Sequence, residues 1–120
     1  MGTRKKFAAL DLSFASKYLA RRFATRKALA KTYGDEQAQR IIRRLDDLIA
    51  APDLAAMRAT PGRCHELVGD RAGTLALDLK HPYRLIFAPA HAPIPRRPDG
   101  GLDWAAVTAV QILAVEDYHG

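Results

Sequence analysis

The sequence contains one cysteine, one tryptophan and no long run of apolar residues. Cys64 cannot form an internal disulfide and has no neighbouring cysteines that would make a zinc site, which indicates a reducing compartment. No apolar stretch approaches the ~20 residues that cross a bilayer. The apolar part of the N-terminus is short and is interrupted by Asp11, so a secretory signal is not expected. We expect a cytoplasmic protein.

The usual signatures of metal and nucleotide cofactors are also missing. The four histidines show neither HxxxH nor HxxE spacing, the acids do not cluster with them, and there is no P-loop or dinucleotide fingerprint. We therefore expect no metal and no cofactor. Positive charge, by contrast, is in excess: 19 Lys and Arg face 13 Asp and Glu, a net charge of +6. This favours a polyanionic partner, with nucleic acid first and an acidic protein or a membrane surface next, although many small basic proteins bind no nucleic acid.

A chain of 120 residues with 48% apolar residues predicts one compact domain over 1–120. Residues 1–7 are polar and basic and are expected to be flexible. Leu10, Leu12 and Phe14 then alternate with polar residues, which predicts a first strand over about 8–14.

Helical periodicity follows from residue 16 to residue 51. The stretch 16–33 is one helix or two, since Thr25 could cap a second one. Gly34 breaks the pattern, and Asp35 is the expected N-cap of a helix that Pro52 ends. The arginines of 35–51 are expected to lie mostly in solvent. Two helices joined by a short break predict an antiparallel hairpin whose apolar stripe covers a sheet.

Three strands and two turns are predicted between residues 63 and 87. Gly69-Asp70 and Gly73 mark the first turn, and His81-Pro82 marks the second. The period of two places the large apolar residues of these strands on one face. The other face carries His65, Arg84 and Arg71, and such a cationic face, not needed for the core, is the first indication of function.

The segment 88–103 is proline-rich, contains Gly100-Gly101 near its end, and is predicted to be an exposed loop insertion. Its Arg96-Arg97 tip could contact a partner, or the loop could have lengthened by drift. A final strand is predicted over 104–116, and the residues after it would lie at the rim of the sheet. The predicted fold class is thus α+β: an N-terminal strand and an antiparallel helical hairpin packed on a small, mostly antiparallel, twisted sheet.

The residues available for chemistry suit cleavage of RNA without a metal. RNA carries its own nucleophile, the 2′-hydroxyl, so an enzyme must accept that proton, protonate the leaving 5′-oxygen and stabilise the charge on the phosphate. Histidine titrates near neutrality, and arginine matches phosphate geometry. Most histidines on strands nevertheless serve no such purpose. Cys64 and His65 should point to opposite faces, which disfavours a Cys–His nucleophile.

The order of motifs resembles the HigB-like (killer protein) branch of the RelE/ParE toxin superfamily. The resemblance covers about 8–119 and is most specific in H-x-L-x-G-D-R-x-G at 65–73, P-Y-R-L-I-F at 82–87 and D-Y-H at 117–119. It implies a RelE-like fold and the toxin of a type II toxin–antitoxin pair, a ribosome-dependent endoribonuclease (mRNA interferase). The implied partners are a helix-turn-helix, HigA-like antitoxin, the ribosome and mRNA. The toxin–antitoxin complex is expected to bind operator DNA, and no membrane partner is expected.

The resemblance also implies roles for individual residues. His65 and His119 would be the acid–base pair, and Tyr118 would orient or stack on the substrate. Asp117 would position the C-terminal site, and Arg84 would stabilise the scissile phosphate.

Arg71 would be a further contact to the RNA backbone. Relatives commonly have lysine before the glycine of the first motif, where this chain has Val68. Arg71 or Arg63 could replace the lost cation, or the activity could be weaker.

Two other classes of function remain open at this point. One is a non-enzymatic inhibitor of DNA gyrase, as in the ParE branch. The other is a degenerate member that only binds RNA or its antitoxin. The D-Y-H ending favours the nuclease, because a protein that only binds needs no pair of histidines.

Overall fold

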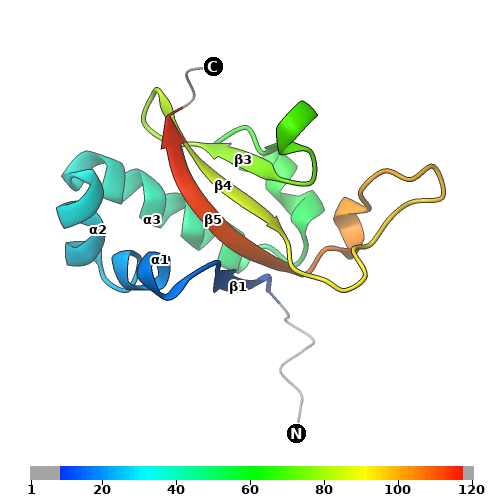
Figure 1. Cartoon of the computed structure of the whole chain (residues 1–120), viewed down its shortest axis with the longest axis horizontal. Coiled ribbons are helices and arrows are strands. Elements are labelled where there is room, and N and C mark those ends of the chain that lie inside the picture. Colours follow the sequence, from blue (N-terminus) through cyan, green and yellow to red (C-terminus); the bar gives the residue numbers. More distant parts are fainter. Residues whose placement is uncertain (1–8, 118–120) are drawn as a thin grey trace, which may run out of the picture.

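The computed structural model describes residues 9–117, which form one sheet with helices against it (Figure 1). The sheet has five strands in the order β1-β5-β4-β3-β2. β1 pairs with β5 in parallel, and the other neighbours are antiparallel. The predicted α+β class with a mostly antiparallel sheet is confirmed. The strands are β1 (Asp11–Phe14), β2 (His65–Glu66), β3 (Leu75–Asp78), β4 (Tyr83–Pro89) and β5 (Ala109–Asp117).

Three α-helices follow β1: α1 (Lys17–Arg22), α2 (Arg26–Tyr33) and α3 (Asp35–Ala50). The stretch 16–33 is two helices, because the Thr25 hydroxyl accepts the Ala28 N–H at 3.0 Å and starts α2. Asp35 is not the N-cap of α3. That position belongs to Gly34, whose φ of +89° suits glycine, and Asp35 begins the first turn, where its charge favours the helix N-terminus.

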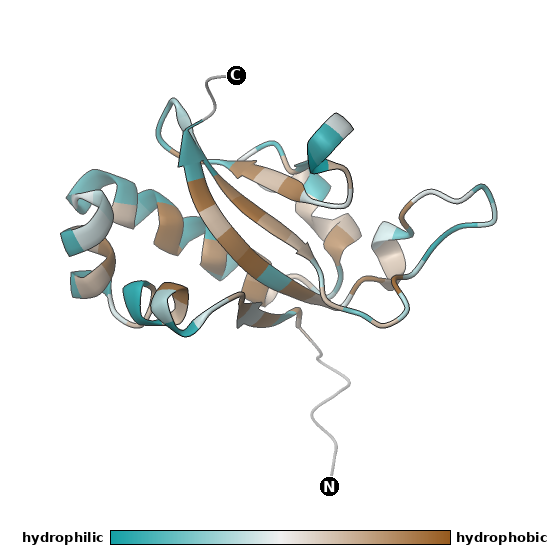
Figure 2. Cartoon of the chain, viewed as in Figure 1, coloured by the Kyte–Doolittle hydropathy of each residue, from teal (hydrophilic) through white to brown (hydrophobic). Residues whose placement is uncertain are grey.

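The core lies between the helices and one face of the sheet, where apolar residues gather (Figure 2). Ile41 and Leu48 of α3 pack there with Leu85, Phe87 and Ile112 of the central strands, and all five are fully buried. The predicted inward face of β4 is confirmed except at Tyr83, the first residue of the strand, which is 42% exposed. The opposite face of the sheet is partly covered as well, since Ala76 and Ile86 are also buried there.

Arg44 departs from the expected solvated face of α3. It is 7% exposed, and its Nε–H donates to the Asp78 carbonyl at 2.9 Å. Burial lowers the pKa of this guanidinium. The Asp78 N–H in turn donates to the Gly62 carbonyl at 2.7 Å, and the Arg63 guanidinium binds the Asp78 carboxylate at 3.0 Å. We call this set, Gly62, Arg63, Asp78 and Arg44, the Asp78 junction; it ties α3 and β3 to the residues that lead into β2.

The segment predicted as an exposed loop, 88–103, is shorter and better anchored than expected. Ala88 and Pro89 belong to β4, Arg96 and Leu102 form an isolated β-bridge, and Leu102 is buried. The last strand begins only at Ala109, because the residues predicted to start it form a short 3-10 helix. The 3-10 turns are η2 (Leu54–Ala59), η3 (Gly69–Arg71) and η4 (Trp104–Ala106).

Trp104 of η4 fastens this end of the fold to the edge strand. Its indole N–H donates to the Glu66 carboxylate at 2.8 Å, and the Arg58 guanidinium stacks on its ring at 3.9 Å. β2 is only two residues long, so this hydrogen bond adds a second attachment to the pairing of β2 with β3.

Substitution of Gly62 by alanine should destabilise the protein by about 3 kcal/mol. The new Cβ would lie 2.7 Å from Arg44 Nε, and a φ of +108° strains any side chain. Gly73→Ala is the matched control: its φ is +94°, but nothing lies within 4 Å of the added Cβ, so only the backbone cost of about 1 kcal/mol applies. Urea unfolding measures both, and equal losses would contradict the tight packing at the Asp78 junction.

Candidate functional site on the sheet face opposite the helices

The strand register places the candidate residues on the sheet face that points away from the helices. Arg84 is paired with Asp78 on one side and Glu116 on the other. His65 is paired with Ala76, and Ala76 with Ile86, which lies two residues from Arg84. Opposed residues and alternate residues share a face. The face therefore brings His65 and Arg84 to the same side of the sheet, about 12 Å apart for two strand spacings across and two residues along.

We call this set the polar face. Its members are His65, Asp78, Arg84 and Glu116, together with Arg71 and Arg63, which bind its two carboxylates.

The arginines of the polar face are paired with acids that the sequence analysis did not single out. Arg71 Nη2 donates to Glu116 Oε1 at 2.5 Å, and both side chains are partly exposed. Arg63 pairs with Asp78. Arg84 stands between the two carboxylates in the row across β3, β4 and β5. The face is thus a charge network with a small positive excess, not the purely cationic surface predicted.

Glu116 was missed because β5 was interpreted as a strand buried on both sides. Its true exposure is mixed, with Leu113, Ala114, Val115 and Glu116 all half-buried. Alternation along β5 places Glu116 on the opposite face from Val115, which is the face of its partner Arg84.

His65 is held by its own backbone neighbourhood. Its ring Nδ1 lies 2.7 Å from the Arg63 carbonyl oxygen. A carbonyl only accepts, so in the neutral ring Nδ1 carries the hydrogen and Nε2 carries the lone pair. Arg63 directs that carbonyl from a left-handed backbone conformation, with a φ of +51°, which is uncommon for a residue with a side chain. The arrangement leaves Nε2 able to accept a proton.

The C-terminal candidates fall largely beyond the part of the chain that the structure describes. Tyr118 and His119 lie outside the described residues. Asp117 is the exposed last residue of β5 and is paired with Tyr83. By alternation it points to the face opposite that of Glu116, at the rim of the helix-covered side. Its expected role in positioning the C-terminal site stays a prediction.

Val68, at the position where relatives commonly have lysine, is 83% exposed on the turn between β2 and β3. The two residues expected to replace the lost cation are both engaged by acids, Arg63 by Asp78 and Arg71 by Glu116. A phosphate on this face would have to compete with those carboxylates for them.

Cys64 is not suited to nucleophilic chemistry. Burial raises the pKa of its thiol to about 12, against a small opposing effect of the Arg58 charge, so the reactive thiolate is scarce near neutral pH. Within residues 9–117, no group of three or more His, Cys, Asp or Glu side chains is placed to hold a metal ion. The same part of the chain contains no helix long and apolar enough to span a membrane.

Comparison with known proteins bears on the fold. No model of a protein family matches the chain, and no curated protein does. Among solved structures, the YoeB dimer from Staphylococcus aureus aligns with a TM-score of 0.52 over 94% of this chain and 100% of that chain. The chain has a YoeB-like fold. This is the RelE-like fold expected from the motifs, but at 16% identity the likeness shows the fold alone and does not single out the HigB-like branch.

The His65 contact predicts a definite tautomer. At a pH where the ring is neutral, nitrogen NMR should show the hydrogen on Nδ1, because the Arg63 carbonyl accepts it. Exposed His81 serves as the internal reference for an unconstrained ring. Finding the His65 hydrogen on Nε2 instead would rule out the backbone contact.

The buried thiol predicts a stability that depends on pH. The folded state keeps the Cys64 proton up to a pKa of about 12, whereas the unfolded chain loses it near the ordinary value of 9.0. The unfolded state therefore binds fewer protons in that interval, and the free energy of unfolding should fall as pH rises from about 9 towards 12. Urea unfolding of Cys64→Ala is the control, and an identical alkaline decline in this variant would show that another group is responsible.

Proposed function

We propose that this protein is the toxin of a type II toxin–antitoxin pair and a ribosome-dependent, metal-independent endoribonuclease that cleaves mRNA. The observation that carries the proposal is the shared sheet face of His65 and Arg84, next to the end of β5. The sequence continues from that end directly into Tyr118 and His119. The YoeB-like fold supports the same class.

In the proposed reaction, His65 acts as the base. Its Nε2 accepts the proton of the RNA 2′-hydroxyl, as the tautomer set by the Arg63 carbonyl favours. The 2′-oxygen attacks the phosphorus, the bond from phosphorus to the 5′-oxygen breaks, and a 2′,3′-cyclic phosphate forms. His119, as imidazolium, donates the proton that the leaving 5′-oxygen takes.

The arginines stabilise the charge that develops on the phosphate. Arg84 lies in the row between Asp78 and Glu116. In the proposal these two acids fix the side chains around Arg84 before RNA binds. Arg71 is the second cation, and it moves from Glu116 to the phosphate when RNA binds. Exchange of a carboxylate for a phosphate oxygen retains a charge-assisted hydrogen bond for Arg71.

Arg63 takes a different part from the RNA contact first expected for it. Its guanidinium binds Asp78, and its backbone carbonyl holds the His65 ring. We assign it as a positioning residue for His65. Tyr118 and Asp117 keep the roles implied by the resemblance, in orienting the substrate and positioning the C-terminal site.

The proposed partners follow from the toxin class. They are a helix-turn-helix, HigA-like antitoxin, the ribosome and its mRNA, in the cytoplasm, with operator DNA bound by the toxin–antitoxin complex. The chain's net charge of +6 suits an RNA-rich partner.

Induced expression should arrest growth and produce breaks in mRNA, and His119→Ala or His65→Ala should lower the cleavage rate by about 10²–10⁴-fold, the usual contribution of a general acid or base. His81→Ala is the matched control, because His81 lies on the exposed turn before β4 and should leave cleavage unchanged. Circular dichroism checks that each variant is folded.

Primer extension on cellular mRNA measures the breaks, and a supercoiling assay tests the gyrase alternative. Arrest that persists in both histidine variants, with supercoiling inhibited and mRNA intact, would replace the nuclease by a ParE-like inhibitor.

A further inference from the structure

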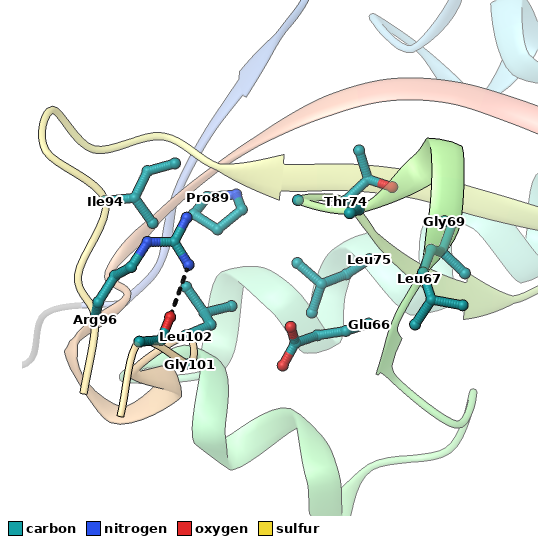
Figure 3. Close-up of a pocket in the computed structure, with 14 residues that line it drawn as sticks. Glu66, Leu67, Gly69, Thr74, Leu75, Pro89, Ile94, Arg96, Gly101 and Leu102 are labelled. Atoms are coloured by element: carbon teal, nitrogen blue, oxygen red, sulfur yellow. Dashed lines mark hydrogen bonds between the residues drawn. The ribbon is translucent and has the colours of Figure 1, made fainter. Parts of the chain in front are cut away.

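A recess with mostly apolar walls lies at the other end of β4 from Arg84. Its volume is about 480 Å³, within the range of small-molecule sites. One wall is the turn that joins β2 to β3, including Val68 and Gly69, and the other is the 90–102 segment, including Ile94 and Leu102 (Figure 3). The 90–102 segment, predicted as part of an exposed loop that could have lengthened by drift, therefore forms one wall of a pocket.

Two charged side chains of opposite sign reach into this pocket from opposite walls, Glu66 and Arg96 (Figure 3). The ion pairs found among residues 9–117 do not join them to each other. Glu66 Oε2 accepts the Trp104 indole N–H at 2.8 Å, which fixes the carboxylate and leaves Oε1 for a ligand. Arg96 Nη1 donates to the Gly100 carbonyl at 3.3 Å, which holds the guanidinium over the pocket.

We propose that this pocket binds a guanine base. Guanine presents two adjacent donors, N1–H and N2–H₂, on one edge and two acceptors, O6 and N7, on the other. The Glu66 carboxylate suits the donor edge, and a guanidinium is the common partner of O6 and N7. Val68 and Leu102 supply apolar surface for the flat faces of the ring.

The other bases fit less well, for reasons of hydrogen bonding. Adenine and cytosine each place a ring-nitrogen lone pair beside the amino group that would face Glu66, and uracil flanks its single N–H with two carbonyls. Each of these would set an acceptor against the carboxylate, so that two acceptors face each other with no hydrogen between them, and guanine is preferred.

The guanine could come from an RNA strand or from a free nucleotide. The pocket and Arg84 lie at opposite ends of β4, about 17 Å apart for five residues of strand. A strand whose scissile phosphate sits at Arg84 could therefore place a base a few nucleotides away in the pocket. Only this RNA source rests on the proposed function; binding of the base does not.

The test uses Trp104, the only tryptophan in the chain, whose indole shares Glu66 with the proposed ligand. Titration of the whole protein with 5′-GMP should change Trp104 fluorescence, with a dissociation constant at least tenfold lower than those for 5′-AMP, 5′-CMP and 5′-UMP. Amide NMR shifts of Gly69, Gly73 and Gly101 at the walls give a second readout. No saturable response, or equal affinity for the four nucleotides, overturns the proposal.

Variants locate the binding groups. Glu66→Gln keeps an acceptor for Trp104 but turns an amino group towards the base, so the preference for GMP should be lost. Arg96→Met should weaken GMP binding at least tenfold. Arg97→Met is the matched control, because Arg97 is paired with Asp99 and does not line the pocket; equal losses in the two arginine variants would contradict the assignment.

A 2′-O-methylated oligoadenosine with one internal guanosine separates the two sources. A preference for this strand over pure oligoadenosine identifies an RNA base, and binding of GMP with no such preference identifies a free nucleotide. Guanine binding by a protein that cleaves no RNA would support the guanine pocket and rule out the proposed nuclease. RNA cleavage by a protein that binds all four nucleotides alike would support the nuclease and rule out the guanine pocket.

Discussion

The structure depends on the hydrogen bonds made by one residue of β3, Asp78. Its carbonyl accepts from buried Arg44, its N–H donates to Gly62, and its carboxylate binds Arg63. The first bond fastens the sheet to α3, and the other two fix the start of the two-residue strand β2. A strand of two residues makes few backbone hydrogen bonds to its neighbour, so the position of His65 depends on the Asp78 junction.

The same junction connects the core to the chemistry. Arg44 is buried, and its guanidinium donates to the backbone carbonyl of Asp78. A buried arginine without a hydrogen-bond partner would destabilise the folded state. Gly62 leaves room for the Arg44 side chain because glycine has no Cβ. Arg63 then takes a left-handed conformation, and its carbonyl sets the tautomer of His65. The proton acceptor of the proposed reaction is in this way oriented by packing that begins in the helix layer.

The charged side chains of the polar face are arranged in pairs. Asp78 and Glu116 restrain Arg63 and Arg71, with Arg84 between the acids in the strand row. Such pairs are worth little to stability when they are exposed to solvent. In the proposed reaction their value is in orientation, because an arginine already held by a carboxylate, as Arg71 is by Glu116, meets a phosphate at a smaller cost in side-chain entropy than a free one.

Periodicity in the sequence was enough to predict the class of fold, the inward residues of β3 and β4, and the shared face of His65 and Arg84. Those features follow from local patterns. The Asp78 junction did not, because Arg44 looks like any other arginine on a helix, and only tertiary contact shows that a carbonyl 34 residues away needs it.

The pocket was missed for a related reason. A proline-rich stretch shows no period, and it is the Arg96–Leu102 bridge and the Trp104–Glu66 bond that give this one a fixed shape. The roles of Tyr118 and His119 rest on the motif resemblance, since both residues lie outside the part of the chain that is described.

The central proposal is that one phosphodiester group of RNA meets His65 and Arg84 on the polar face, together with Tyr118 and His119, which follow β5 in the sequence. A crystal structure with a short RNA carrying a 2′-O-methyl group at the cleavage position tests it most directly. The account predicts the scissile phosphate within hydrogen-bond distance of Arg84, the modified 2′-oxygen facing His65 Nε2, and Arg71 released from Glu116. RNA bound against the helices, with the pairs of the polar face intact and His65 remote from any phosphate, would contradict it.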